Sequence, residues 1–180
     1  VELFSTPLEG VWELHSQPFQ DHRGAFLNAF RLQEPVFQQV WGDRPIAQVN
    51  LSCTNVVGTV RGLHLQAAPH AEAKLVRALR GRVWDVAVDL RESSSTFGCW
   101  HAVELSPEQG NALLIPEGCA HGFQVLEASS ELLYLHSGAW IPEAEGGIRW
   151  DDATLAIDWP MPVAALSERD QLLPHLELKP

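Results

Sequence analysis

The chain has 180 residues, is 46% apolar and carries a net charge of −11, from 12 Lys and Arg against 23 Asp and Glu. This length fits one domain with ample material for a hydrophobic core. The acidic balance argues against a nucleic-acid partner, and the absence of a long apolar run argues against a membrane partner. The first ten residues also lack the pattern of a signal peptide. Cys53, Cys99 and Cys119 have no zinc-type spacing, which indicates reduced thiols in a cytoplasmic protein.

Short alternating or β-branched segments recur along most of the chain, bounded by Gly, Pro, Ser or Asn. Pro35 suits the first turn of a short helix. A tight hairpin turn is expected at Gly81 and Arg82, and a longer turn at 106–110. This spacing favours an all-β sandwich or jelly-roll barrel over a dinucleotide-binding α/β fold. The predicted strands are 11–15, 25–30, 46–53, 59–66, 73–79, 82–90, 101–105, 113–115, 121–126 and 131–136, and the predicted helix is 34–41.

Residues 148–159 are rich in Trp and Asp and are followed by a Pro-rich bend. Beyond the bend, Ser167 and Asp170 form a variant of the capping box that starts a helix. This pattern gives Asp170 a purely structural explanation.

The stretch 58–81 places one histidine and one lysine inside two successive apolar strands. Strict alternation puts Val60, Gly62, His64 and Gln66 on one face of the first strand. In the second, Lys74 shares a face with two apolar residues. An unpaired lysine is costly to bury, so it has a partner, a ligand or water beside it. The alternative is that it extends to solvent from the end of its strand.

The glycines and prolines of this region resemble the two sequence signatures of cupin barrels. The second ligand histidine of a cupin is replaced by Gln66, and the ligand glutamate by Lys74. A cation beside a divalent metal is unfavourable, and two imidazoles fall short of the three protein ligands usual at a catalytic metal site. We therefore expect no metal, and a pocket used for acid–base chemistry. The residues that match the cupin frame are Gly58, His64, Gly81, Gly110, Pro116, Gly118 and His121.

A set of motifs from about residue 19 to residue 170 resembles the dTDP-4-dehydrorhamnose 3,5-epimerase family. Each motif alone is weak, but their joint order and spacing are highly specific. The matching runs are 61–64 (RGLH), 74–77 (KLVR), 85–91 (DVAVDLR), 95–98 (STFG), 115–118 (IPEG), 120–123 (AHGF), 133–134 (LY), 147–150 (GIRW), 157–160 (IDWP) and 166–167 (LS) with Asp170.

The resemblance implies an all-β, cupin-type jelly-roll β-barrel with N-terminal strands and short C-terminal helices. The expected organisation is a single domain over 1–180, with the barrel core at about 46–140 and segment 141–180 closing over it. The resemblance further implies a homodimer without a cofactor.

The implied reaction is epimerisation of a dTDP-4-dehydro-6-deoxyhexose at C3 and C5 through an enolate. His64 matches the general base of the family, and Asp170 matches the carboxylate that orients it. Tyr134 matches the acid on the opposite face of the sugar, and Lys74 the cation that stabilises the enolate oxygen. Phe19 and Arg23 match positions that cross from the partner subunit. The substrate-binding residues expected are Arg23, Arg61, Gln48, Asn50, Phe19, His121 and Trp140.

A structural role is the alternative for each of these residues, because a lone histidine or tyrosine on a strand is more often structural than catalytic. His121 is as well suited to supporting the pocket as to binding. Asp85 and Asp89 share a strand face and are candidates for pairing with Lys74 or with arginines. Strict alternation puts Arg61 opposite His64, unless a bulge at Gly62 intervenes.

The chain departs from the family pattern at Leu65, Asn28, Ala139-Trp140 and Leu135, where aromatic, Glu, Tyr-Tyr and Lys residues are usual. Three other functions therefore stay open: a 3- or 5-monoepimerase on a related nucleotide sugar, a non-catalytic sugar-binding cupin and a metal-dependent cupin. Gln66 and Lys74 disfavour the last.

Overall fold

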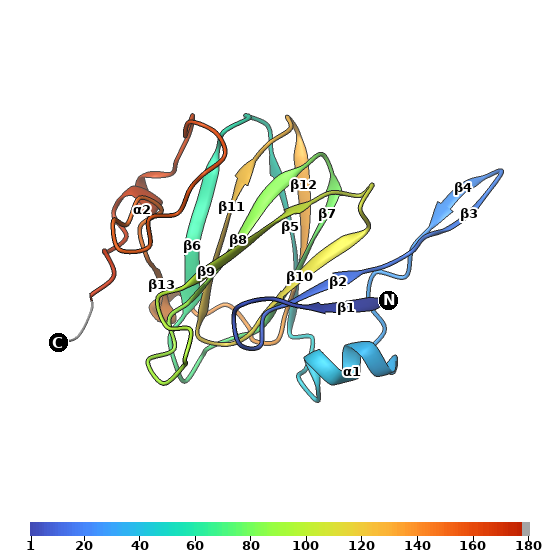
Figure 1. Ribbon diagram of the computed structural model, residues 1–180, viewed down its shortest axis with the longest axis horizontal. Helices are drawn as coiled ribbons and strands as arrows, with labels where there is room; N and C mark the ends of the chain where they lie inside the picture. The colour runs from blue at the N-terminus through green and yellow to red at the C-terminus, as the bar shows by residue number, and fades with distance from the viewer. Residues whose placement is uncertain (178–180) are drawn as a thin grey trace.

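The computed structural model describes residues 1–177 and is built from two facing β-sheets (Figure 1). One sheet has six strands in the order β1-β2-β10-β7-β12-β5, and the other has five in the order β13-β6-β11-β8-β9. The strands are β1 Glu2–Ser5, β2 Trp12–His15, β3 Phe19–Asp21, β4 Gly24–Phe26, β5 Gln48–Thr54, β6 Val60–Gln66, β7 Lys74–Arg80, β8 Val83–Asp89, β9 Trp100–Leu105, β10 Asn111–Ile115, β11 Cys119–Val125, β12 Ser130–His136 and β13 Glu145–Gly147; the helices are α1 Pro35–Trp41, α2 Glu168–Gln171 and the 3-10 turn Pro142–Ala144.

The prediction of an all-β jelly roll is confirmed. Each predicted strand has an observed counterpart, although the segment expected at 25–30 is strand only to Phe26. The hairpin turn at Gly81 is also present, where φ is +67° and an added Cβ would meet Ser130. Three strands were not predicted, namely β1, β3 and β13.

The main hydrophobic core lies between the two sheets and includes Val76, Leu132 and Phe123, all nearly or fully buried. Along β7 the inward side chains change from Val76 to Lys74, and along β12 from Leu132 through Tyr134 to His136. The barrel is therefore apolar at one end of these strands and polar at the other. The polar side chains at that end line a cavity between the two sheets.

Helix α1 begins at Pro35, as predicted, and covers the outer face of the six-stranded sheet. Its residues Phe37 and Trp41 are fully buried in a second cluster with Leu75 and Leu114. Proline fits this first turn because its missing N–H has no partner inside the helix.

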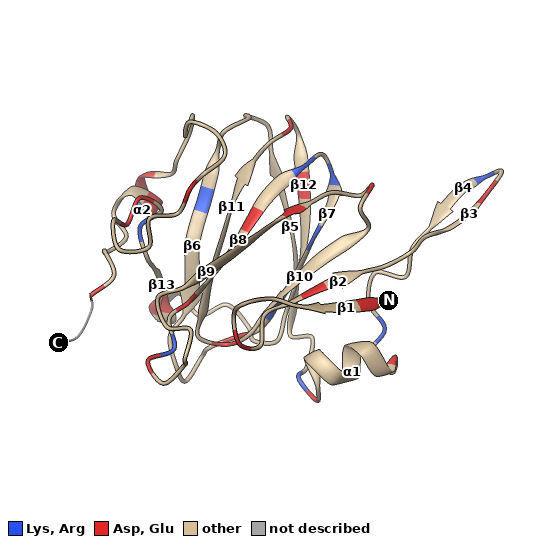
Figure 2. Ribbon diagram, viewed as in Figure 1, with Lys and Arg blue, Asp and Glu red and all other residues tan. Residues whose placement is uncertain are grey.

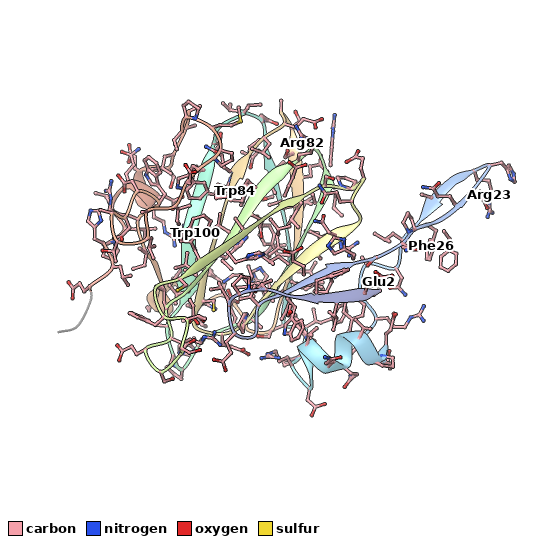
Figure 3. The ribbon with its side chains drawn as sticks, viewed as in Figure 1. Glu2, Arg23, Phe26, Arg82, Trp84 and Trp100 are labelled. Carbon is pink, nitrogen blue, oxygen red and sulfur yellow. The ribbon has the colours of Figure 1, made fainter. Side chains whose placement is uncertain are left out.

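The C-terminal segment runs along the outside of the five-stranded sheet, beside β6 (Figure 1). Trp84 of β8 packs edge-on against Trp100 (Figure 3) and also against Trp159 of the C-terminal segment. The indole N–H of Trp100 donates to Leu155 O at 2.9 Å. Of the segment 141–180 expected to close over the barrel, residues 178–180 lie outside the described part. Among residues 1–177, no helix is both long enough and apolar enough to cross a membrane.

Strands β3 and β4 form a hairpin arm that projects away from the barrel (Figure 1). Phe19 and Phe26 are paired in its register and are 78% and 70% exposed. At its tip Arg23 forms an ion pair with Asp21, and the two charges are visible in Figure 2. Within its own chain the arm covers no part of the core.

Candidate active site

A cavity of about 750 Å³ opens between the two sheets at their polar end. Strands β5, β7 and β12 supply one wall, and β6 and β11 supply the other. The residues that line it include Gln48, Asn50, Ser52, Arg61, His64, Leu65, Gln66, Glu72, Lys74, His121, Tyr134, His136, Ala139, Trp140, Glu145 and Arg169.

His64 and Asp170 form a close pair, with His64 Nε2 2.6 Å from Asp170 Oδ1. The other carboxylate oxygen accepts the backbone N–H of Gly62 at 3.1 Å. Burial raises the pKa of Asp170, but the hydrogen bond and charge of His64, the Gly62 N–H and Ser167 outweigh it and hold that pKa below its ordinary value. The ionised carboxylate places the imidazole proton on Nε2, so a neutral His64 carries its lone pair on Nδ1.

A β-bulge in β6 brings Arg61 to the same cavity as His64. His121 pairs with His64 and Phe123 with Arg61, so three residue steps on β6 match two on β11. Gly62 sits at this irregularity with φ +118°. The strict alternation expected for β6 is therefore wrong at this point, and the bulge proposed to reconcile Arg61 with His64 is present. Arg61 Nε donates to Thr54 Oγ1 at 3.0 Å.

Tyr134 lies in the wall opposite His64, on β12, with its hydroxyl 3.0 Å from Ser52 Oγ. Burial raises the pKa of the phenol well above its ordinary value, and the hydrogen bond between Tyr134 and Ser52 only partly offsets this. The hydroxyl therefore stays protonated through the physiological range. It is a proton donor facing the cavity.

His121 is paired with Asp85, which is fully buried, at 2.8 Å between Nε2 and Oδ1. Burial raises the pKa of Asp85, and the charge and hydrogen bond of His121 oppose that rise. The suggested pairing of Asp85 with Lys74 is therefore wrong. The suggested pairing of Asp89 with an arginine is correct, because Asp89 binds Arg91 at 2.8 Å.

Lys74 is only 7% exposed, which excludes the alternative that it extends to solvent from the strand end. Its Nζ lies 3.0 Å from Glu72 Oε1, and Glu72 Oε2 lies 3.2 Å from His136 Nδ1. Burial raises the pKa of Glu72, but His136 and the ammonium of Lys74 outweigh it and hold that pKa below its ordinary value. The partner expected for a buried lysine is thus present.

Gln66 occupies the cupin ligand position but directs its amide at the backbone. Its Oε1 accepts the N–H of Ile141 at 2.6 Å, and its Nε2 donates to Ala139 O at 3.0 Å and His70 O at 3.2 Å. The residue therefore ties two loops together at the cavity rim. Within 1–177, no group of three or more His, Cys, Asp or Glu is arranged to hold a metal ion.

The structure brings together most of the predicted site residues. Asp170 stands behind His64, and nearly all the others line the cavity directly. Phe19 and Arg23 do not line the cavity of their own chain, because they belong to the projecting arm. Figure 3 shows Arg23 at the far end of this arm. Of the departures from the family pattern, Leu65 and Ala139 line the cavity, whereas Leu135 packs in the cluster of α1.

Four ionisable lining residues were not predicted: Glu72, His136, Glu145 and Arg169. Glu145 accepts from the indole of Trp140 at 2.6 Å and pairs with Arg169 at 2.8 Å, which joins the rim to α2. His136 was detectable in principle, since it stands two residues beyond Tyr134 on the same strand face. Glu72 precedes its strand, so alternation gave no signal for it.

Comparison with known proteins identifies the family. The family model for dTDP-4-dehydrorhamnose 3,5-epimerase matches residues 5–177. The enzyme of that name from Sinorhizobium fredii is 42% identical over 91% of this chain and 83% of its own length. A dTDP-4-dehydrorhamnose 3-epimerase from Streptomyces niveus is 42% identical over 91% of this chain and 78% of its own length.

Solved structures agree with this assignment. The crystal structure of dTDP-4-dehydrorhamnose 3,5-epimerase from Elizabethkingia anophelis has a TM-score of 0.90 at 40% identity and covers 97% of this chain and 95% of its own. A 4-keto-6-deoxy sugar epimerase from Streptomyces spheroides has a TM-score of 0.91 at 38% identity, covering 97% and 86%. The chain belongs to the dTDP-4-dehydrorhamnose 3,5-epimerase family.

Proposed function

We propose that this protein is an isomerase that epimerises dTDP-4-dehydro-6-deoxy-D-glucose at C3 and C5, giving dTDP-4-dehydro-L-rhamnose. The observation that carries this function is the pair of opposed proton-transfer groups: His64, held by ionised Asp170, lines one wall of the cavity, and protonated Tyr134 lines the other. Inverting a carbon requires a base on one face of the sugar and an acid on the other.

The proposed reaction begins with the ketone at C4, which acidifies the hydrogens on C3 and C5. His64 removes one of these protons, and the electron pair of the C–H bond forms an enolate whose oxygen carries the charge. Tyr134 then protonates the same carbon from the opposite face. The proton on His64 leaves to solvent and Tyr134 regains one, after which the second carbon reacts in the same way.

Lys74 is proposed to stabilise the enolate oxygen. It is a buried cation in the same cavity, and its charge acts there with little screening by water. Removing one oxyanion donor costs about 3 kcal/mol of transition-state stabilisation in other enzymes.

Substrate binding is proposed for Arg61, Gln48, Asn50 and Trp140, which line the cavity, and for His121 beside them. A relative from Bacillus anthracis has been solved with TDP and pyrophosphate, and one from Legionella pneumophila with dTDP-4-keto-L-rhamnose. The diphosphate of such a ligand is negatively charged, and an arginine side chain such as that of Arg61 binds phosphate oxygens well.

We propose a homodimer in which Phe19 and Arg23 of each arm reach the cavity of the partner. The exposed phenylalanines of the arm support this arrangement, because paired aromatic side chains in water are typical of a binding surface. The whole chain, 1–180, is proposed to act as one jelly-roll domain in the cytoplasm.

A monoepimerase acting at C3 is the second candidate. Besides the 3-epimerase from Streptomyces niveus, a 3'-monoepimerase from Streptomyces bikiniensis has a TM-score of 0.87 at 33% identity. Leu65 and Ala139 alter the lining of the cavity where the family has larger side chains. Such a change in shape affects how the sugar ring sits, and so which carbon faces the base.

Proton NMR of dTDP-4-dehydro-6-deoxyglucose in D2O tests the function directly. Incubation with the protein is expected to remove the signals at both C3 and C5, and His64→Ala to slow this by about 10²–10⁴-fold, the usual contribution of a positioned base. A chelator is expected to leave the rate unchanged.

Loss of signal at one carbon alone would make the protein a monoepimerase. Absence of exchange at both carbons would refute the acid–base assignment and favour a sugar-binding module. Sensitivity to the chelator would instead favour a metal-dependent cupin.

A further inference from the structure

Glu72 sits between two other buried side chains on the cavity wall. Its two carboxylate oxygens are divided between Lys74 Nζ at 3.0 Å and His136 Nδ1 at 3.2 Å. All three residues are less than one-tenth exposed. A buried ammonium needs a counter-charge to stay ionised, and Glu72 is the acidic group in contact with it. With a neutral imidazole, the three side chains together carry no net charge.

A directed chain of hydrogen bonds fixes which nitrogen of His136 carries the proton. The N–H of Trp140 donates to Gln48 Oε1 at 3.0 Å, and Gln48 Nε2 donates to Asn50 Oδ1 at 3.0 Å. Asn50 therefore presents its NH2 group to His136 Nε2, 3.3 Å away, which must accept. The proton of a neutral imidazole is left on Nδ1, the atom that faces Glu72.

We propose that Glu72 and His136 are positioning residues that hold the Lys74 ammonium for the enolate oxygen and link it, through Asn50 and Gln48, to the backbone of Trp140 at the cavity rim. This inference rests on the proposed function. It assigns a part in catalysis to residues that need not touch the substrate.

The hydrogen bonds from Trp140 through Gln48 and Asn50 to His136 all donate in the same direction, from the rim toward the imidazole. Substrate that moves Gln48 or Asn50 changes the donor offered to His136 Nε2, and so the imidazole nitrogen presented to Glu72. The position of the Lys74 ammonium then depends on what occupies the rim. A neutral side chain at position 72 breaks this dependence at the step nearest the ammonium.

The other ionisable groups around the cavity are present in the protein and in its Glu72 variants alike. A difference in pH profile between the protein and its Glu72 variants is therefore assigned to the altered carboxylate. These groups are Arg61 and His64 on β6, Asp85 on β8, His121 on β11, Tyr134 on β12, Glu145 on β13, and Arg169 and Asp170 on α2.

The test compares Glu72→Gln, Glu72→Asp and the unchanged protein by hydrogen exchange at C3 and C5 across pH. Glu72→Gln is expected to lower kcat by at least about 10-fold while KM stays within about 2-fold, the pattern of a group felt only in the transition state. The alkaline limb of its pH profile is also expected to change, because the carboxylate that faces the ammonium at 3.0 Å is replaced by a neutral amide. Glu72→Asp is expected to reverse most of both changes.

Glu13→Gln is the matched control. Glu13 also pairs with a histidine, His101 at 2.8 Å, but belongs to β2 and lies outside the cavity lining. It is expected to change neither kcat nor the pH profile.

His136 gives a second, independent arm that keeps the carboxylate. His136→Leu removes both the acceptor for Asn50 and the imidazole nitrogen that lies 3.2 Å from Glu72, and is expected to lower kcat about 10-fold. His136→Gln retains a donor and an acceptor and is expected to lose less. This arm decides the matter if Glu72→Gln does not fold.

The inference is overturned if Glu72→Gln and His136→Leu keep the kcat and the alkaline limb of the unchanged protein. Failure of the proposed function looks different, since the unchanged protein itself would then exchange neither hydrogen. That result would refute both the proposed function and the inference that rests on it.

Discussion

Asp170 uses its two carboxylate oxygens on two different partners. One binds His64 at 2.6 Å and the other accepts the N–H of Gly62 at 3.1 Å. The structural explanation offered by the sequence is half correct: the Ser167 hydroxyl caps α2 by accepting the Asp170 N–H, while the Asp170 side chain binds His64 and the Gly62 N–H. Capping and orientation of the base therefore belong to different atoms of one residue.

Asp170→Asn is expected to lower kcat by about 10²-fold, because the amide cannot balance the charge that His64 gains when it takes a proton. The same exchange assay in D2O measures it. Ser167→Ala is the control: it removes the cap and costs about 1 kcal/mol of stability, with kcat nearly unchanged. Equal loss of activity in both variants would mean that Asp170 acts only through the fold of α2.

At this scale the sequence predicted the residues that belong to motifs, Asp170 beside His64 among them, and missed Glu72 and His136 beside Lys74. His64 and Lys74 stood out because a strong polar group interrupts an apolar strand. Glu72 and His136 did not, since their meeting depends on the pairing of β7 with β12, between segments distant in the chain. Pairing of that kind leaves no local signal.

The bulge in β6 decides which way Arg61 and His64 point. It lets Arg61 and His64 share a wall, although they are three positions apart. Gly62 allows it, because a Cβ at this position would lie 2.6 Å from Gly122 Cα and 2.7 Å from His121 O, at a φ of +118°. Gly122 supplies the room on the neighbouring strand.

Gly62→Ala is therefore expected to destabilise the protein by at least about 2 kcal/mol, since such backbone conformations cost a side chain about 1–3 kcal/mol before any clash is counted. Chemical denaturation measures the change. Gly146→Ala is the matched control on β13, where an added Cβ meets nothing within 4 Å. Comparable losses at the two glycines would contradict the assigned importance of the bulge.

Most elements were predictable because they are buried on one face and end at glycines or prolines. The strands that escaped prediction have little burial to pattern them: β3 is exposed throughout, and β13 has the sequence Glu-Gly-Gly. They are strands because of what they pair with. The bulge could be suspected from Gly62, but its existence follows from the register against β11.

At the scale of the whole molecule, the arm and strand β5 expose large apolar side chains that no other part of the described chain covers. Phe19 and Phe26 stand on the arm, and Val49 and Leu51 on β5 are more than half exposed. Strand β5 is also the last strand of its sheet. Such a surface favours association with a second copy.

Hybrid dimers test whether the arm completes the partner's site. Arg23→Ala is expected to raise KM by roughly 10- to 100-fold through a lost hydrogen bond to a charged group, and His64→Ala to abolish turnover. Co-expression of the two variants leaves each hybrid one site with both residues intact. Turnover with the KM of the unchanged protein is therefore expected to return.

Arg82→Ala is the control, because Arg82 is also an exposed arginine but lies in a hairpin outside the cavity (Figure 3). It is expected to leave KM unchanged. If the hybrids show no turnover at normal KM, the arm does not serve the partner's site.

The bonds of Gln66 also bear on how the family could change over evolution. A single change to histidine would restore the cupin ligand, but it would leave the Ile141 N–H and two carbonyl oxygens without the amide that now satisfies them. Each such loss costs about 1–3 kcal/mol when the group is buried. Lys74 would need to be replaced as well, together with its counter-charge Glu72. Each single substitution toward the cupin set of metal ligands is thus disfavoured by the contacts that the present side chains make.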